Sequence, residues 1–319
     1  DTAWIKPGKV AWEWWHNYKL DGVDFTPGVN TETYLYHVDF AEEFGLEYVL
    51  IDWKWTDLRD LTKVNPEVDI KGICQYAAER DIKVIVWTPA YSLDMDLDNV
   101  LDLYKSFGIS GIKTDFFNRE DQLANRMYER IAKAAADRKF IVNFHGCTKP
   151  NGLSKMYPNV LNYEAVRGNE HNKWKGISLE HHLHIPFIRM PCGTMDFTPG
   201  GMRNAGKGEW RKAGKPMVSG TRAHQAAMYV VYFEALKTLA DSPTAYEKEP
   251  DFTKFIAAIP TTWDDTIVLS GKLGEYLSMA RKTGTTWYVG LMNNWEPRTL
   301  QVDLSFLAPG NYSVSILKD

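Results

Sequence analysis

At 319 residues the chain is long enough for a barrel of about 250 residues and a smaller unit beside it. Its net charge of −4 is too small to indicate a nucleic acid or an anionic membrane as partner. No apolar run approaches the roughly 18 residues that a membrane-spanning helix needs. The three cysteines lie far apart and indicate neither a metal site nor a disulfide framework.

The first 240 or so residues alternate strand and helix patterns, which predicts parallel βαβ units. One strand is expected to end at Asp115, and the others are expected at residues 10–14, 48–52, 83–87, 140–144 and 160–163. Helices are expected at residues 31–44, 70–80, 97–107 and 121–137. Asn30 or Thr31 would begin the first of these helices, and Gly45 would end it.

The pattern is weaker after Glu170. A short helix and a seventh strand are expected within residues 181–195, and a long surface loop over residues 198–216. A helix over residues 224–239 and an eighth strand near residues 238–242 complete the series. The sequence therefore predicts a (β/α)8 TIM barrel over residues 1–262.

The pattern changes near Trp263. Short β runs separated by Gly and Asn-Asn turns follow, at residues 266–269, 276–281, 286–291 and 300–304. They predict a smaller antiparallel all-β domain, a β-sandwich module, over residues 263–319. Residues 313–317 still have a strand pattern, which leaves open whether the module is complete.

Carboxylates follow two of the expected strands. Asp115 ends the stretch Gly-Ile-Lys-Thr-Asp, and Glu164 and Glu170 follow the strand at 160–163. Barrel enzymes carry their chemistry at the C-terminal ends of the strands, and glycoside hydrolysis needs one carboxylate on each side of a cleft. The alternative is that Asp115 caps the next helix and that the two glutamates are solvated loop charges.

Other polar groups follow neighbouring strands, namely Glu13, Asp52, Lys113 and His145. Their convergence on one rim favours a site over chance. Lys113 lies on the same strand face as Asp115, so it would lower the pKa of that carboxyl or bind sugar hydroxyls. The alternative for Lys113 is an ion pair inside the barrel.

Twelve Trp and sixteen Tyr are a high aromatic content. Several of these rings lie near expected strand ends, where flat faces suit the apolar faces of sugars, and the alternative is core packing. We expect Trp12 and Trp87 to bind substrate, together with Lys113, Asp52 and His145.

The sequence resembles the catalytic part of glycoside hydrolase family 97, a family of bacterial exo-acting α-glycosidases. The resemblance rests on residues 4–12, 111–116, 145–150 and 162–170. It implies a β-sandwich domain before the barrel. We expect that domain to be absent from this chain and to be the intramolecular partner of the barrel in the longer protein. It also implies a periplasmic or secreted location in a bacterium.

The family has two branches, and the inverting α-glucosidases lack a carboxylate at the end of the fourth strand. They place a base glutamate directly after the histidine of the fifth-strand motif, a position that Gly146 occupies here. The sequence therefore resembles the retaining branch, which implies that Asp115 is the nucleophile and Glu170 the acid/base. Glu170 would need a raised pKa, from partial burial and from neighbours such as Glu164.

Family members also bind calcium beside the acid/base residue. The resemblance implies Glu164 and Glu170 as ligands of Ca²⁺, with a further glutamate from the domain before the barrel. The residues His181, His182 and His184 suggest zinc at first, but without a cysteine or a second cluster they predict a helix with a polar lining.

Together these features predict a retaining exo-acting α-galactosidase that hydrolyses terminal non-reducing α-galactosides through a covalent glycosyl-enzyme intermediate. A retaining α-glucosidase of the same family remains an alternative, since it would differ only in how the pocket meets the O4 hydroxyl. A carbohydrate-binding relative without catalysis is a second alternative, which the presence of Asp115 and Glu170 disfavours. The expected partner is an oligosaccharide or another glycoside.

Overall fold

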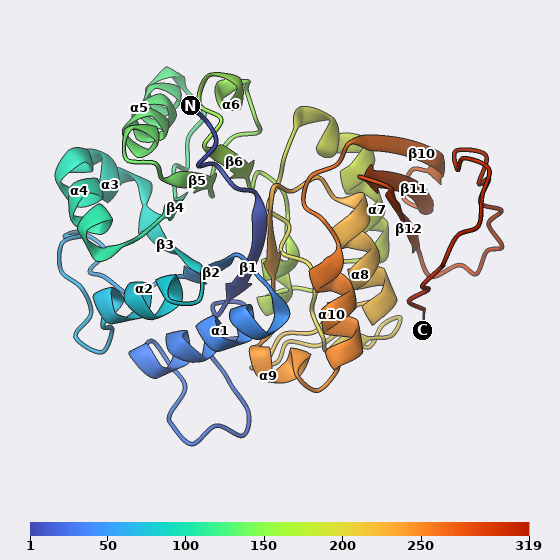
Figure 1. Ribbon diagram of the computed structural model, residues 1–319, viewed down its shortest axis with the longest axis horizontal. Helices are drawn as coiled ribbons and strands as arrows, with labels where there is room; N and C mark the ends of the chain where they lie inside the picture. The colour runs from blue at the N-terminus through green and yellow to red at the C-terminus, as the bar shows by residue number, and fades with distance from the viewer. Residues whose placement is uncertain (319) are drawn as a thin grey trace.

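A computed structural model of the chain describes residues 1–318. Its first part is a nearly closed parallel barrel of seven regular strands in the order β6-β5-β4-β3-β2-β1-β9. The strands are β1 (Gly8–Trp12), β2 (Tyr48–Ile51), β3 (Lys83–Pro89), β4 (Gly111–Asp115), β5 (Ile141–Phe144), β6 (Val160–Tyr163) and β9 (Leu236–Leu239). Figure 1 shows the helices arranged around this sheet. The predicted TIM-barrel class is confirmed.

The first helix begins and ends at the residues that the sequence indicates. Asn30 accepts a hydrogen bond from the backbone N–H of Thr33 at the start of the first helix, and Gly45 ends it with a φ of 69°. The helices are α1 (Thr31–Phe44), α2 (Ile70–Ala78), α3 (Ala90–Met95), α4 (Leu97–Phe107), α5 (Gln122–Asp137), α6 (Leu153–Met156), α7 (Leu179–Ile188), α8 (Arg222–Val231), α9 (Pro243–Tyr246) and α10 (Pro250–Ala258). Two 3₁₀ helices lie at Asn169–Lys173 and Met190–Cys192.

The helix after β4 decides one alternative. Asp121 begins α5 by accepting a hydrogen bond from the backbone N–H of Ala124. Asp115, six residues earlier in the chain, is therefore not the cap of this helix, and its carboxylate stays at the end of the strand.

The barrel has two apolar cores because side chains alternate between the two faces of each strand. Val10, Tyr48 and Ile85 belong to the cluster inside the barrel. Their chain neighbours Val49 and Val84 belong to the larger cluster between the sheet and the outer helices. The inner core fills the lower part of the barrel with apolar side chains and leaves the polar residues to its C-terminal end.

The predicted seventh strand is not a regular strand. Residues 193–199 cross the space between β6 and β9, with Met195 and Phe197 fully buried. Met195 donates a backbone hydrogen bond to Phe233. The side chain of Asn162 joins the two edges, since its Nδ2 donates to Leu236 O at 2.7 Å and its Oδ1 accepts from the backbone N–H of Ala235 at 3.0 Å. A side-chain amide thus replaces part of a strand ladder.

Two predictions in the second half of the barrel are wrong, the helix over residues 224–239 and the surface loop over residues 198–216. The helix expected over residues 224–239 ends at Val231, because the buried ammonium of Lys237 donates to the carbonyl oxygens of Tyr229 and Tyr232 at the helix end. The eighth strand, β9, accordingly starts at Leu236.

The segment expected as a surface loop over residues 198–216 begins in the core, since residues 198–201 are buried. It also contains a short strand, β7 (Asn204–Ala205), which pairs in parallel with β8 (Val218–Ser219).

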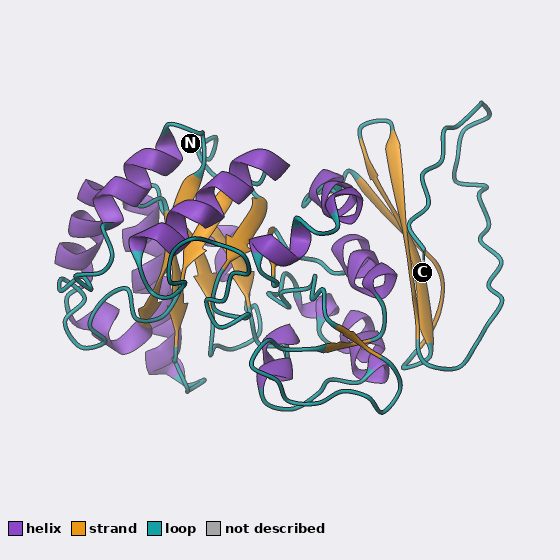
Figure 2. Cartoon of the chain, turned by 90° about the horizontal axis from the view of Figure 1, so that it is seen from below, coloured by secondary structure: helices purple, strands orange, loops and turns teal. Residues whose placement is uncertain are grey.

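The smaller unit is an antiparallel sheet of three strands, β10 (Asp265–Lys272), β11 (Tyr276–Thr283) and β12 (Thr286–Asn293). Its strand β12 packs against α8. The two elements are so close at Gly290 that a Cβ there would lie 2.8 Å from the side chain of Val231. Figure 2 shows these three long strands beside the helices, with an extended loop beyond them.

Two β runs predicted for this unit are wrong. Residues 300–304 and 313–317 form no regular strand, and their side chains are mostly exposed, with Val314 and Ile316 at 73% and 77%. A strand pattern needs a pairing partner, and the described chain offers none here. The boundary predicted at residue 263 lies two residues before β10 and stays a prediction.

The alternatives for the histidines and cysteines are also resolved. The stretch with three histidines forms α7, as predicted, and the three cysteines have free thiols. Among the described residues, no helix combines the length and apolar character needed to cross a membrane.

The buried imidazoles predict how stability depends on pH. His16 and His37 stack with their ring centroids 5.5 Å apart, and both are buried. Burial lowers the pKa of His37 to about 4 and also lowers the pKa of His16. An unfolded histidine titrates near 6.5, so between these values the unfolded state binds more protons. The neutral, buried histidines therefore contribute to the free energy of unfolding. This contribution is complete above pH 6.5 and is lost as the pH falls toward 4.

We therefore expect His37→Gln to remove up to about 3 kcal/mol of the stability difference between pH 7 and pH 4. Chemical unfolding at a series of pH values measures this difference. His184→Gln, at a partly exposed position, is the matched control. Identical pH profiles for His37→Gln and the unsubstituted chain would contradict the assignment.

Candidate active site

Asp115 lies at the C-terminal end of β4 with its carboxylate held by two donors. Its Oδ2 accepts from the indole N–H of Trp87 at 3.0 Å, and its Oδ1 accepts from the backbone N–H of Phe116 at 2.6 Å. Phe116 and Asn118 have φ values of 65° and 51°, which non-glycine residues rarely adopt. This strained turn keeps the Phe116 N–H directed at the carboxylate, which stays partly exposed.

Gly146 is packed beneath the same carboxylate. Its φ is +50°, and a Cβ at this position would lie 2.7 Å from Asp115 Oδ1 and 2.8 Å from Phe116 N. Its own N–H donates to Glu164 Oε2 at 2.9 Å. A carboxylate at position 115 and a side chain at position 146 therefore compete for one space. Such a side chain would also meet the backbone of the turn at Phe116.

Glu164, Glu170 and His145 come together beyond the ends of the neighbouring strands β5 and β6. Their ligand atoms all lie within 4.8 Å of one another. Glu164 follows β6, and Glu170 lies in the 3₁₀ helix Asn169–Lys173. Burial and the nearby Glu164 raise the pKa of Glu170 to about 7. Glu170 can thus hold a proton near neutral pH, as a general acid requires.

Asp196 belongs to this cluster, although the sequence analysis did not single it out. Its Oδ2 accepts from Asn143 Nδ2 at 2.6 Å and lies 2.6 Å from His145 Nε2. Asp196 is on the irregular segment in the seventh position of the barrel. The only signal in the sequence is a carboxylate between the apolar residues Met195 and Phe197.

His145 lies between two carboxylates. Its Nε2 contacts Asp196, and its Nδ1 lies 3.6 Å from Glu164 Oε2. Burial and the ammonium of Lys113 oppose a charge on His145, but Glu164 and Asp196 outweigh them and raise its pKa to about 9. The imidazolium therefore connects the buried Asp196 to the glutamates at the mouth.

Lys113 forms a buried ion pair at the floor of the cluster. Its Nζ lies 2.9 Å from Asp52 Oδ2, and both side chains are at most 4% exposed. Burial opposes the charge on Lys113, yet Asp52, Glu170 and Asp115 keep its pKa raised. The interior ion pair, the alternative left open above, is present. The same ammonium also interacts with the carboxylates at the mouth.

The aromatic residues near the site fall into two groups. Trp12 is 1% exposed, donates to Asp52 Oδ2 at 2.7 Å and is covered by Trp14, whose ring centroid lies 5.6 Å away. Trp15 and Trp55 are likewise core residues. Trp174 is 51% exposed and lies 5.8 Å from Trp14. The indole N–H groups of Trp12 and Trp87 donate to the carboxylates of Asp52 and Asp115. Contact of these two rings with substrate stays a prediction.

Two stretches of the chain match known families. Residues 12–166 match glycoside hydrolase 97, and residues 262–319 match the glycosyl-hydrolase 97 C-terminal domain, described as an oligomerisation domain. The chain belongs to glycoside hydrolase family 97. The first match covers the barrel from the end of β1 to β6, including Asp115 and Glu164, and the second covers the antiparallel sheet.

Curated relatives align over the whole of this chain. A protein named retaining alpha-galactosidase from Bacteroides thetaiotaomicron is 45% identical, and one named probable retaining alpha-galactosidase from Streptomyces bingchenggensis is 31% identical. The chain spans about half the length of these relatives, 49% and 48%.

Solved structures of the family superpose well. A family 97 enzyme from Pseudoalteromonas sp. strain K8, in complex with panose, has a TM-score of 0.85 at 28% identity, over 97% of this chain and 53% of that one. A beta-arabinopyranosidase has a TM-score of 0.75 at 27% identity, over 91% of this chain and 47% of that one.

The contact between Gly146 and Asp115 gives a direct test of the site. We expect Gly146→Ala to displace the Asp115 carboxylate and to lower kcat for glycoside hydrolysis at least about tenfold, because a small misplacement of a reacting group is costly. Steady-state kinetics on an aryl α-glycoside measure this loss.

Gly152→Ala is the matched control, since Gly152 also has a positive φ, of +91°, but no atom lies within 4 Å of a Cβ there. It reproduces the backbone strain without the collision. Equal effects of the two substitutions on kcat would show that strain, rather than the contact with Asp115, is responsible.

Proposed function

We propose that this protein is a retaining exo-acting α-galactosidase that hydrolyses terminal non-reducing α-galactosides. The observation that carries the proposal is the oriented carboxylate of Asp115, which occupies the space that a side chain at position 146 would need. The names of the two curated relatives support the same activity.

In the proposed mechanism Asp115 is the nucleophile and Glu170 the acid/base. Asp115 attacks the anomeric carbon while Glu170 donates its proton to the leaving oxygen, so the glycosidic bond breaks and a glycosyl ester forms on Asp115. Glu170 then removes a proton from water, the water oxygen attacks the anomeric carbon, and the ester breaks. Two inversions give net retention.

The buried polar groups bind and orient the sugar in this proposal. Lys113 and Asp52 would meet hydroxyls from the floor of the site, where they are fixed by their mutual ion pair. His145 would bind the sugar beside Glu164 and Glu170. Trp87 holds the nucleophile through its indole N–H, and Trp12 holds Asp52. Rigid support of this kind keeps reacting groups within the narrow range that catalysis needs.

We further propose that Ca²⁺ binds at Glu164 and Glu170. The donor set fits, because two carboxylates converge within 4.8 Å and their mutual repulsion contributes to the raised pKa of Glu170. Oxygen ligands such as these carboxylates suit calcium, which does not prefer an imidazole nitrogen. When bound, the cation would supply positive charge that fixes the orientation of Glu170. A further glutamate from outside this chain would complete the ligands.

A periplasmic or secreted location in a bacterium is part of the same proposal, as is an N-terminal domain that packs on the barrel. The substrate would be an oligosaccharide or a simple glycoside. The main alternative is a retaining α-glucosidase, which is favoured by one observation, the panose complex of the Pseudoalteromonas relative.

The stereochemistry of the product tests the proposed function. We expect the first sugar released from an aryl α-galactoside to be the α anomer, seen by NMR before mutarotation, and hydrolysis of the matching aryl α-glucoside to be much slower. We also expect Glu170→Ala to slow substrates with poor leaving groups more than activated aryl substrates, since only the former need the proton.

Initial release of the β anomer would refute Asp115 as nucleophile. Equal losses in Glu170→Ala on both kinds of leaving group would refute Glu170 as the acid. Faster hydrolysis of the glucoside would leave the mechanism in place and change the sugar.

Calorimetry tests the calcium site. We expect this chain to bind Ca²⁺ weakly, with a dissociation constant of about 1 mM, because two carboxylates are few ligands for this ion. Glu164→Gln should abolish the binding, whereas Glu247→Gln, a partly exposed glutamate of the barrel, should leave it unchanged. Equal binding by the two variants would place calcium elsewhere.

A further inference from the structure

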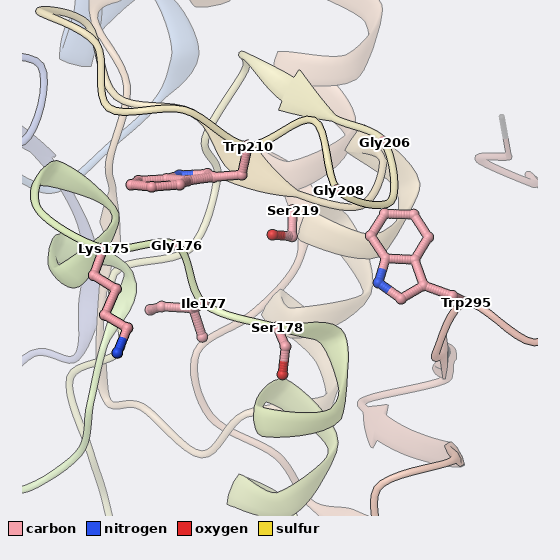
Figure 3. A pocket seen from close by; sticks show the side chains of 9 residues that line it. All are labelled: Lys175, Gly176, Ile177, Ser178, Gly206, Gly208, Trp210, Ser219 and Trp295. Atoms are coloured by element: carbon pink, nitrogen blue, oxygen red, sulfur yellow. The ribbon is translucent and has the colours of Figure 1, made fainter.

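A hollow of about 350 Å³ opens beside the loop that carries Glu170. It is lined by residues of four separate stretches of the chain, within 175–178 and 206–210 and at Ser219 and Trp295. The first segment directly follows the 3₁₀ helix Asn169–Lys173. Figure 3 shows the rings of Trp210 and Trp295 on two sides of the hollow, with the hydroxyl of Ser219 between them. Its volume lies in the range of small-ligand sites, about 300–1,000 Å³.

One wall is a rigid ring. The indole N–H of Trp210 donates to Met217 O at 3.0 Å, which fixes the plane of the ring. Gly176 allows the ring to lie close to the backbone, since a Cβ there would lie 2.7 Å from Trp210 Cδ2. An aromatic ring that is already fixed loses little entropy when a ligand stacks on it.

The opposite wall is also held in place. Trp295 lies on the turn after β12, where Asn293 Nδ2 donates to Glu296 O at 2.8 Å and Arg298 Nη1 donates to Asn293 Oδ1 at 2.7 Å. Lys207, from the loop on the other side, lies 3.4 Å from Glu296. Figure 3 shows the indole nitrogen of Trp295 facing the hollow. The antiparallel sheet thus contributes a donor to a site on the barrel.

We propose that this hollow is a second carbohydrate-binding site, which takes one pyranose ring of an oligosaccharide. The apolar face of the ring would stack on Trp210, while the Trp295 N–H and the Ser219 hydroxyl bind its hydroxyl groups. Among the described residues that line the hollow, Lys175 alone is charged, so the site suits a polar ligand with an apolar face. The inference rests on the proposed glycosidase function, since the site would hold a distal part of the same substrate.

Site-specific NMR tests this proposal. The chain is labelled with ¹⁵N at its tryptophan indoles in an Asp115→Asn background, which prevents turnover, and is titrated with the trisaccharide raffinose. We expect the Trp295 indole resonance, identified by its loss in Trp295→Ala, to shift saturably. Gly176→Ala, which pushes a methyl group into Trp210, should raise the apparent dissociation constant at least about tenfold.

Trp287→Ala is the matched control, because Trp287 is also a tryptophan of the antiparallel sheet but its ring packs on Phe306, outside the hollow. It should change neither the Trp295 shift nor the affinity. A Trp295 resonance that stays in place while Trp14 or Trp174 shifts would overturn the second site and leave the proposed function intact. A saturable Trp295 shift, combined with an unsubstituted full-length protein that cleaves no α-galactoside, would support the second site and refute the proposed function.

Discussion

The buried charges at the mouth of the barrel are the constraint on which the rest of the site depends. Asp52 and Asp196 are almost fully buried, and Glu164 and Glu170 lie close together beside them. Burying so many carboxylates without compensation would cost several kcal/mol for each ion. The cation of Lys113 supplies part of the compensation from the centre of the cluster.

The imidazolium of His145 supplies further positive charge for these carboxylates. The two cations act on different carboxylates, since Lys113 pairs with Asp52 while His145 contacts Asp196 and lies near Glu164. Asp115 is different, because its hydrogen bonds come from neutral N–H donors. A carboxylate held by neutral donors keeps its negative charge available for a reacting centre. The arrangement thus separates the carboxylates that are paired with cations from Asp115, the proposed nucleophile.

The parts of the fold that the sequence predicted are those with local signals. The first helix has its cap at Asn30 and its terminal glycine at Gly45, so its bounds follow from the sequence. The end of α8 depends instead on Lys237, which returns from the next strand to bind its carbonyl oxygens. The sequence pattern of the helix itself does not predict that contact. The exposed runs after β12 show the opposite failure, since their alternation is a strand signal without a partner strand.

The same distinction explains the candidate site. Asp115, Glu164 and His145 could be found because each follows a regular strand whose pattern is visible. Asp196 could not, because its segment has no regular ladder and is fixed by backbone hydrogen bonds to Phe233 and Ala240, on either side of β9, and to Asn169. Its importance is visible only once Asn143 and His145 are seen to share its Oδ2.

The packing of Gly146 against Asp115 explains why a barrel of this kind would use one base position at a time. The backbone N–H of Gly146 is committed to Glu164, so the residue cannot move away to admit a side chain. A longer residue at 146 would need the space that the Asp115 carboxylate fills. Removal of the Asp115 carboxylate alone would relieve only part of the collision, because a Cβ at position 146 would still lie 2.8 Å from Phe116 N. Close packing beneath the nucleophile therefore constrains the position of the Asp115 carboxylate independently of its charge.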